Sequence, residues 1–130
     1  MRILLIADDD QAIRDLNSRV LKRAGYQVVL VENADQAYDA LKERPDIDGA
    51  FMDDDMPGKV YRTGVAVLQQ RRKEGDIRPV TIVSGTLTEE RKREILALDG
   101  GFLDKPLDTD VFKERARYML EKPVKIEGSG

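Results

Sequence analysis

The chain alternates short apolar runs with longer segments whose apolar residues recur at helical spacing. The first run, within residues 2–7, is nearly continuous, as expected for a strand buried on both faces. Further strand-like runs occupy residues 26–31, 49–53, 79–83 and 102–104. Helical segments are predicted at about 11–24, 34–44, 64–74, 87–98 and 110–121. This alternation predicts five βα units, and hence a parallel sheet flanked by helices on both faces.

Polar residues mark where the predicted helices begin and end. Gly25 is expected to end the first helix in a left-handed conformation, and Pro45 closes the second. The predicted N-caps are Asp10, Asn33, Thr63 or Gly64, Thr86 in a capping box with Glu89, and Thr109.

Length and composition suit one globular domain over residues 1–121, followed by a polar tail at 122–130. The net charge of −3 argues against direct nucleic-acid binding. The first apolar run is too short, and too soon followed by acids, to be a signal peptide, and no apolar segment is long enough to span a membrane. We therefore expect a cytoplasmic protein.

The chain contains neither histidine nor cysteine. This excludes disulfides, thiolate metal sites, imidazole ligands and catalysis by an internal histidine. A bound cation must accept oxygen ligands, which favours magnesium, manganese or calcium over zinc.

The chain has two acidic triplets. Asp8–Asp10 directly follow the first predicted strand, and Asp53–Asp55 begin at the last residue of the third. Carboxyl ends of parallel strands meet at one edge of the sheet, so the triplets are expected to converge. Two carboxylates at ~4 Å cost on the order of 4 kcal/mol at a surface-like dielectric, so such a cluster requires a cation or a raised pKa. A helix cap explains Asp10 but not Asp8 and Asp9. An acidic turn before Pro57 remains an equal alternative for Asp53 taken alone.

Two further polar residues follow the fourth and fifth strands. Ser84 could simply bind local backbone, and Lys105 could be an ordinary surface lysine at a turn. Beside clustered carboxylates, however, a lysine supplies counter-charge and suits a phosphoryl oxygen. Carboxylates, a hydroxyl and a lysine together suit phosphoryl transfer onto an aspartate, which needs positioning, a divalent cation and positive charge.

Four motifs, in order at the ends of strands one, three, four and five, resemble the receiver domain of bacterial response regulators. The resemblance covers about residues 2–121 and implies a flavodoxin-like (βα)5 fold. The motifs are Ile3-Leu4-Leu5-Ile6-Ala7-Asp8-Asp9-Asp10, Asp53-Asp54-Asp55-Met56-Pro57-Gly58, Val80-Thr81-Ile82-Val83-Ser84-Gly85 and Phe102-Leu103-Asp104-Lys105-Pro106.

The resemblance implies roles for the acids. Asp53, four residues before Pro57, would be the phosphoacceptor. Asp9 would bind Mg²⁺, or Mn²⁺, directly, and Asp8 through water or its neighbours. Asp53 and the backbone carbonyl of Asp55 would supply further oxygens.

Other roles follow from the same resemblance. Lys105 would pair with Asp53 and then with the phosphoryl group, and the Lys105–Pro106 peptide would be cis. Ser84 occupies the hydroxyl switch position and Phe102 the aromatic one. Several features depart from the family pattern. The loop over residues 57–64 and the segment over residues 45–53 are longer than usual, and the segment around residues 100–101 is shorter. Asp55 adds an anion near the path of the attacking water. Asp54 is interpreted as a bystander.

These features predict a signalling switch, not a classical enzyme. A sensor histidine kinase or histidine phosphotransfer protein would phosphorylate Asp53, and slow autodephosphorylation would reset it. A downstream protein would bind the face formed by helix four, strand five and helix five, with no direct binding of nucleic acid or membrane. The protein would be a monomer or a phosphorylation-dependent dimer. Alternatives are a receiver-like adaptor that acts without phosphorylation, and a phosphatase of the haloacid dehalogenase kind.

Overall fold

The computed structural model describes residues 1–121, in which five strands alternate with five helices. The elements are β1 (Ile3–Ala7), α1 (Gln11–Arg23), β2 (Gln27–Val31), α2 (Ala34–Glu43), β3 (Gly49–Asp53), α3 (Gly64–Lys73), β4 (Val80–Ser84), α4 (Glu89–Ala97), β5 (Gly101–Asp104) and α5 (Thr109–Glu121). The predicted tail at 122–130 lies outside the described residues, so its separation from the domain stays a prediction. Within the described part of the chain, no helix is long and apolar enough to cross a membrane.

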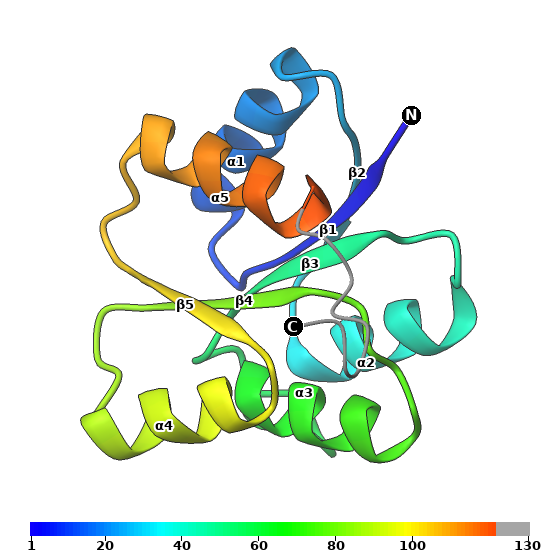
Figure 1. Cartoon of the computed structure of the whole chain (residues 1–130), viewed down its shortest axis with the longest axis vertical. Helices are drawn as coiled ribbons and strands as arrows, with labels where there is room; N and C mark the ends of the chain where they lie inside the picture. Colours follow the sequence, from blue (N-terminus) through cyan, green and yellow to red (C-terminus); the bar gives the residue numbers. More distant parts are fainter. Residues whose placement is uncertain (122–130) are drawn as a thin grey trace, which may run out of the picture.

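The strands form one parallel sheet in the order β2-β1-β3-β4-β5. Helices α1 and α5 cover one face, and α2, α3 and α4 cover the other (Figure 1). The predicted fold class is therefore confirmed. Since β1 lies beside β3, with Ala7 paired to Met52, the residues that end these two strands emerge next to each other.

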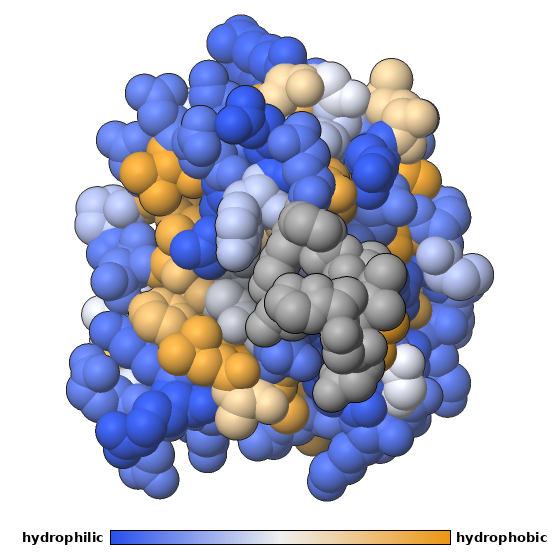
Figure 2. Space-filling view, in the orientation of Figure 1, coloured by the Kyte–Doolittle hydropathy of each residue, from blue (hydrophilic) through white to orange (hydrophobic). Residues whose placement is uncertain are grey.

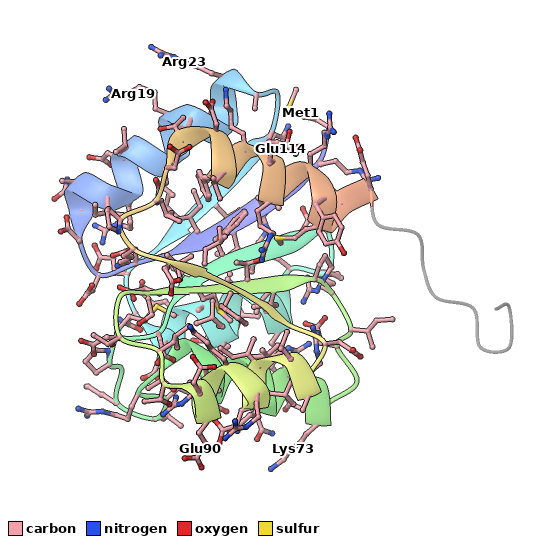
Figure 3. The ribbon with its side chains drawn as sticks, turned by 60° about the vertical axis from the view of Figure 1, so that its left-hand side comes forward. Met1, Arg19, Arg23, Lys73, Glu90 and Glu114 are labelled. Atoms are coloured by element: carbon pink, nitrogen blue, oxygen red, sulfur yellow. The ribbon has the colours of Figure 1, made fainter. Side chains whose placement is uncertain are left out.

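The alternation of side chains along each strand divides the core between the two faces of the sheet. Leu4, Ile6 and Phe51 pack toward α1 and α5, and the ring of Phe51 meets that of Phe112 edge-on at a centroid distance of 4.6 Å. Leu5, together with its neighbours on the other face, packs toward the remaining helices. The central strands β1, β3 and β4 are buried on both faces, which explains why their sequences are mostly apolar. Charged side chains such as Arg19, Arg23 and Lys73 point away from the sheet (Figure 3).

Three of the predicted N-caps are confirmed. The Asp10 carboxylate accepts hydrogen bonds from Ala12 and Ile13, and the Asn33 and Thr63 side chains cap α2 and α3. Gly25, with φ of +97°, follows α1 in the left-handed region that glycine adopts without steric cost.

The other two predicted caps are wrong. Thr88, not Thr86, caps α4 by accepting from the Arg91 amide, because Thr86 is engaged in a turn with Ser84. Asp108, not Thr109, is the N-cap of α5, since its carboxylate accepts hydrogen bonds from the amides of residues 110 and 111.

An arginine–aspartate cluster closes the edge of the molecule where the strands begin. Arg78 donates to the carbonyls of Leu41, Arg44 and Ile47, satisfying the C-terminal end of α2. The Asp76 carboxylate accepts from Arg78 at 2.7 Å and from Arg71 at 3.1 Å. Burial raises the pKa of Asp76, but these hydrogen bonds and charges outweigh it and lower the pKa to about 2.

Replacement of Asp76 should make the protein less stable at neutral pH. An aspartate with a depressed pKa stabilises the fold above its unfolded pKa and loses that contribution as pH falls through the folded value. The contribution of Asp76 is therefore present above about pH 4 and lost toward pH 2, and Asp76→Asn should cost up to about 2 kcal/mol at pH 7. Urea unfolding across this pH range measures it. The exposed Asp39→Asn serves as control, and equal curves for both variants would contradict the assignment.

Candidate functional site

Side chains from three strand ends meet at the carboxyl edge of the sheet, on the left of Figure 1. Asp8 follows β1, Asp53 ends β3, and Lys105 follows β5. The Lys105 ammonium lies 3.1 Å from a carboxylate oxygen of Asp53 and 3.5 Å from one of Asp8. Both aspartates are buried, whereas about a third of the lysine side chain is exposed. The predicted convergence of the two acidic triplets is thus present in the fold.

Asp9 completes a group of three acids. Asp8, Asp9 and Asp53 each offer one carboxylate oxygen, and these oxygens all lie within 4.8 Å of one another. Asp9 is exposed, so the group is open to solvent on one side. One ammonium does not balance three carboxylates. A donor set of clustered carboxylate oxygens with an open side fits a hard divalent cation such as Mg²⁺, which keeps several waters when protein-bound.

Burial and ion pairing have opposite effects on the pKa of Asp53 and on that of Lys105. Burial raises the pKa of Asp53, and the hydrogen bond and charge of Lys105 only partly offset this. For Lys105, burial lowers the pKa, but the hydrogen bond and charge of Asp53, aided by Asp8, outweigh it and raise the pKa. The lysine is therefore held as a cation between two carboxylates.

Arg14 holds the turn that carries the first acids, and it was not identified from the sequence. Its nearly buried guanidinium donates to the backbone carbonyl of Asp8 at 2.7 Å and lies 3.4 Å from Glu32. The Asp8 carboxylate in turn accepts from the amide of Asp10 at 2.9 Å. The only sequence signal was an arginine one turn into α1, and it does not distinguish a buried role from an exposed one.

The two residues predicted from the resemblance to be switch residues, Ser84 and Phe102, lie in β4 and β5. The Ser84 hydroxyl accepts from the Thr86 amide at 3.1 Å and lies 3.3 Å from the Thr86 hydroxyl. Phe102 is half-buried, and the ammonium of Lys92 lies 5.3 Å from its ring centroid. The Lys105–Pro106 peptide is cis.

The second triplet divides into three different environments. The Asp55 amide donates to the Asp53 carboxylate at 3.2 Å, while the Asp55 side chain is exposed. Asp54 is not the bystander that the sequence suggested. Its carboxylate accepts from the Val65 amide at 3.3 Å and lies 3.7 Å from Arg91 of α4.

The long loop after Pro57 is held by Asp35 of α2. The Asp35 carboxylate accepts the amides of Lys59, Val60 and Tyr61 at 2.7 to 3.2 Å. These hydrogen bonds, that of Tyr61 foremost, lower the pKa of Asp35. A Cβ at Gly58 would lie 2.5 Å from the carboxyl carbon of Asp35, so a larger residue there would displace this carboxylate. The partners are more than twenty residues apart, which is why the sequence pattern did not reveal them.

A cavity of about 420 Å³ opens beside Asp53 and Lys105. Its other walls are mostly apolar side chains of α1, β1 and the β5–α5 segment, among them Ile13, Leu16 and Leu107. Asp8, Asp53 and Lys105 are the charged residues that line this otherwise mostly apolar cavity.

The geometry agrees with comparisons to known proteins. The profile described as the response regulator receiver domain matches residues 4–127. The chain belongs to the response regulator receiver family. Receiver domains of this family bind Mg²⁺ at an acidic pocket and interact with kinases and downstream effectors, and the Asp8, Asp9 and Asp53 cluster fits that phosphoacceptor site. The family is one of signalling proteins and not of classical enzymes, which favours the receiver interpretation over the phosphatase alternative.

Relatives and solved structures show the same family. The chain is 30% identical to the response regulator MprA of Mycolicibacterium vanbaalenii, over 98% of this chain and 54% of that protein. It is 36% identical to the sensory/regulatory protein RpfC of Xanthomonas campestris pv. campestris, over 69% of this chain and 12% of that protein. The receiver domain of NtrX from Brucella abortus is 27% identical, with a TM-score of 0.81 over 92% of this chain and 99% of that one. The receiver chain spans about half the length of MprA.

Removal of the lysine charge should raise the pKa of Asp53 further. In Lys105→Gln the main group that opposes burial is gone, so the metal-free Asp53 carboxyl should titrate at a higher pH than in the wild type. Carboxyl ¹³C NMR titration measures the midpoint directly. Lys22→Gln, at an exposed position in α1, is the control. An unchanged Asp53 midpoint in Lys105→Gln would show that the lysine does not control the carboxylate.

Proposed function

We propose that this receiver domain accepts a phosphoryl group on Asp53 and thereby changes its affinity for a partner protein. One observation supports this most strongly: Lys105 lies within 3.5 Å of both Asp8 and Asp53, in a cluster where carboxylates outnumber cations. The ammonium of Lys105 alone does not neutralise the negative charge of these carboxylates. A divalent cation that binds with the phosphoryl group would supply the missing positive charge.

The proposed donor is a phosphohistidine of a sensor histidine kinase or of a histidine phosphotransfer protein. Because this chain has no histidine, the phosphohistidine belongs to another protein. A carboxylate oxygen of Asp53 forms a bond to phosphorus, and the phosphorus–nitrogen bond breaks. The electron pair stays on the departing imidazole nitrogen, and the product is an acyl phosphate. Lys105 keeps its positive charge throughout and offsets the negative charge on the phosphoryl oxygens.

The acids that would hold the cation are Asp8, Asp9 and Asp53, with the backbone carbonyl of Asp55. When bound, Mg²⁺ supplies positive charge to the phosphoryl oxygens, and Mn²⁺ suits the same oxygen donors. The Asp55 amide already donates to the Asp53 carboxylate, which orients one oxygen and leaves the other for Lys105.

The phosphoryl group adds about −1.5 to −2 charges and new acceptor oxygens. We propose that the Ser84 hydroxyl then leaves Thr86 and donates to the phosphoryl group. Phe102 would move into the space that Ser84 vacates and leave its contact with the Lys92 ammonium, which couples the site to α4.

The downstream protein is proposed to bind the α4–β5–α5 face. Leu96 of α4 and Val111 and Tyr118 of α5 are exposed there at 49 to 60%. Figure 2 shows apolar surface on the side of the molecule where β5, α4 and the start of α5 lie. A cytoplasmic location, and a monomer or phosphorylation-dependent dimer, stay predictions.

Phosphorylation should depend on Asp53 alone among the second triplet. Incubation with phosphoramidate and Mg²⁺ should add the mass of one phosphate to the wild type and to Asp55→Asn, and none to Asp53→Asn, as intact mass spectrometry will show. Equal labelling of wild type and Asp53→Asn would contradict the assignment. Partner binding that is unchanged by Asp53→Ala would favour the adaptor alternative.

Metal affinity should depend on Asp9. Asp9→Asn removes an exposed carboxylate of the proposed metal site, and Mg²⁺ affinity should fall on the order of tenfold or more. Calorimetric or NMR titration with Mg²⁺ measures the change. Asp10→Asn is the matched control, because it removes the adjacent charge while asparagine still caps α1. The same loss in both variants would indicate a general effect of charge and no direct ligand at Asp9.

A further inference from the structure

Asp54, the residue after the phosphoacceptor, contacts three neighbouring elements. Its amide donates to the Val83 carbonyl of β4, and its carbonyl accepts from the Gly64 amide, both at 3.1 Å. Its carboxylate accepts from the amide of Val65, the second residue of α3, and faces Arg91 of α4. One side chain therefore connects the end of β3 to the starts of both following helices.

Helix α4 is anchored by little apolar burial of its own, while Arg72 of α3 donates to the carbonyl of Leu98 at its C-terminal end. Ile95 is its one buried residue, whereas α3, of similar length, has four. In the first turn, Glu90 points away from the body of the molecule (Figure 3). The next two residues point inward: Arg91 pairs with Asp54, and Lys92 lies over the Phe102 ring. With so little apolar burial, these two cationic contacts are among the few side-chain contacts that join the first turn of α4 to the rest of the molecule.

The contact between Arg91 and Asp54 is suited to change. Its N–O distance is 3.7 Å, the arginine side chain is 37% exposed, and Arg91 also lies 3.4 Å from Glu94 of its own helix. Partly exposed ion pairs of this kind contribute little free energy, so small changes in the local field redistribute them. A phosphoryl group on Asp53 places new negative charge on the residue next to Asp54.

We propose that Asp54 is a positioning residue that ties α4 to the phosphoacceptor strand through Arg91, so that a change of charge at Asp53 alters how firmly α4 is held. The effect of a charge change at Asp53 on α4 rests on the proposed function. The contact between Asp54 and Arg91 does not, because it is present in the unphosphorylated chain and can be tested there.

The first test measures amide hydrogen exchange in α4 without any phosphodonor. Asp54→Asn and Arg91→Gln should each speed the exchange of the α4 amides by about two- to fivefold, the range that partly exposed ion pairs support. Asp54→Asn leaves the pair of Arg91 with Glu94 intact, so it isolates the contact to β3. Arg91→Lys keeps the charge and should restore most of the protection.

Two controls on the same helix decide the outcome. Arg93→Gln removes an exposed arginine, and Glu94→Gln removes the other partner of Arg91. Neither should alter α4 exchange as Asp54→Asn does. If Asp54→Asn behaves like Glu94→Gln, or if exchange rises equally in all helices, Asp54 does not tie α4 and the proposal is overturned.

The second test adds beryllium fluoride with Mg²⁺ as a phosphoryl mimic and repeats the exchange measurement. In the wild type the mimic should change α4 exchange, and in Asp54→Asn that change should shrink by about half or more while the mimic still binds at Asp53. A full α4 response in Asp54→Asn would contradict transmission through Asp54. Absence of any mimic binding in the wild type would instead count against the proposed function, and the exchange data without the mimic would still decide the tie.

Discussion

Electrostatic repulsion among three carboxylates is the constraint on which the rest of the site depends. The parallel register of β1 and β3 forces Asp8 and Asp53 to emerge side by side, and Asp9 joins them at the solvent edge. Lys105 extends from the end of β5 and, among residues 1–121, supplies the one cation in direct contact with the pair. Because one positive charge cannot neutralise three carboxylates, the site is suited to bind a further cation. Burial, which raises the pKa of Asp53, makes its charged form more costly without that cation.

Such a cluster persists because the backbone around it is held by polar contacts from elsewhere. Arg14 holds the carbonyl of Asp8, Asp35 holds three consecutive amides of the loop after Pro57, and Asp54 holds the start of α3. Each of these side chains satisfies backbone groups in loops where no ladder or helix partner exists. Charged residues near the site therefore serve mainly to fix loops, and the reacting groups are placed as a consequence.

Much of the fold was predictable because its signals are local. Continuous apolar runs predicted the buried strands, and Asp10 and Asn33 predicted helix starts through side chains that reach amides two or three residues away. The convergence of Asp8 and Asp53 followed from the parallel topology, and the pairing of Lys105 with Asp53 from the family resemblance. The errors arose where two local patterns were equally good: Thr86 and Thr88 both suit a cap, and only the turn that engages Thr86 with Ser84 selects Thr88. Arg14, Asp35 and Asp54 escaped prediction because their partners belong to other elements, beyond the reach of sequence periodicity.

The two edges of the sheet make opposite use of charge. At the edge where strands begin, Asp76 is matched by Arg71 and Arg78, its pKa falls to about 2, and the cluster contributes stability. At the carboxyl edge the acids are in excess, and the pKa of Asp53 rises. The ion pairs of Asp76 stabilise the fold at one edge, and this stabilisation offsets the repulsion among the acids at the other. Helix α4 begins near that edge, where Arg91 of its first turn faces Asp54, and it buries a single residue, Ile95. Under the proposed function, the helix with the fewest buried residues begins beside the acids whose charge would change on phosphorylation.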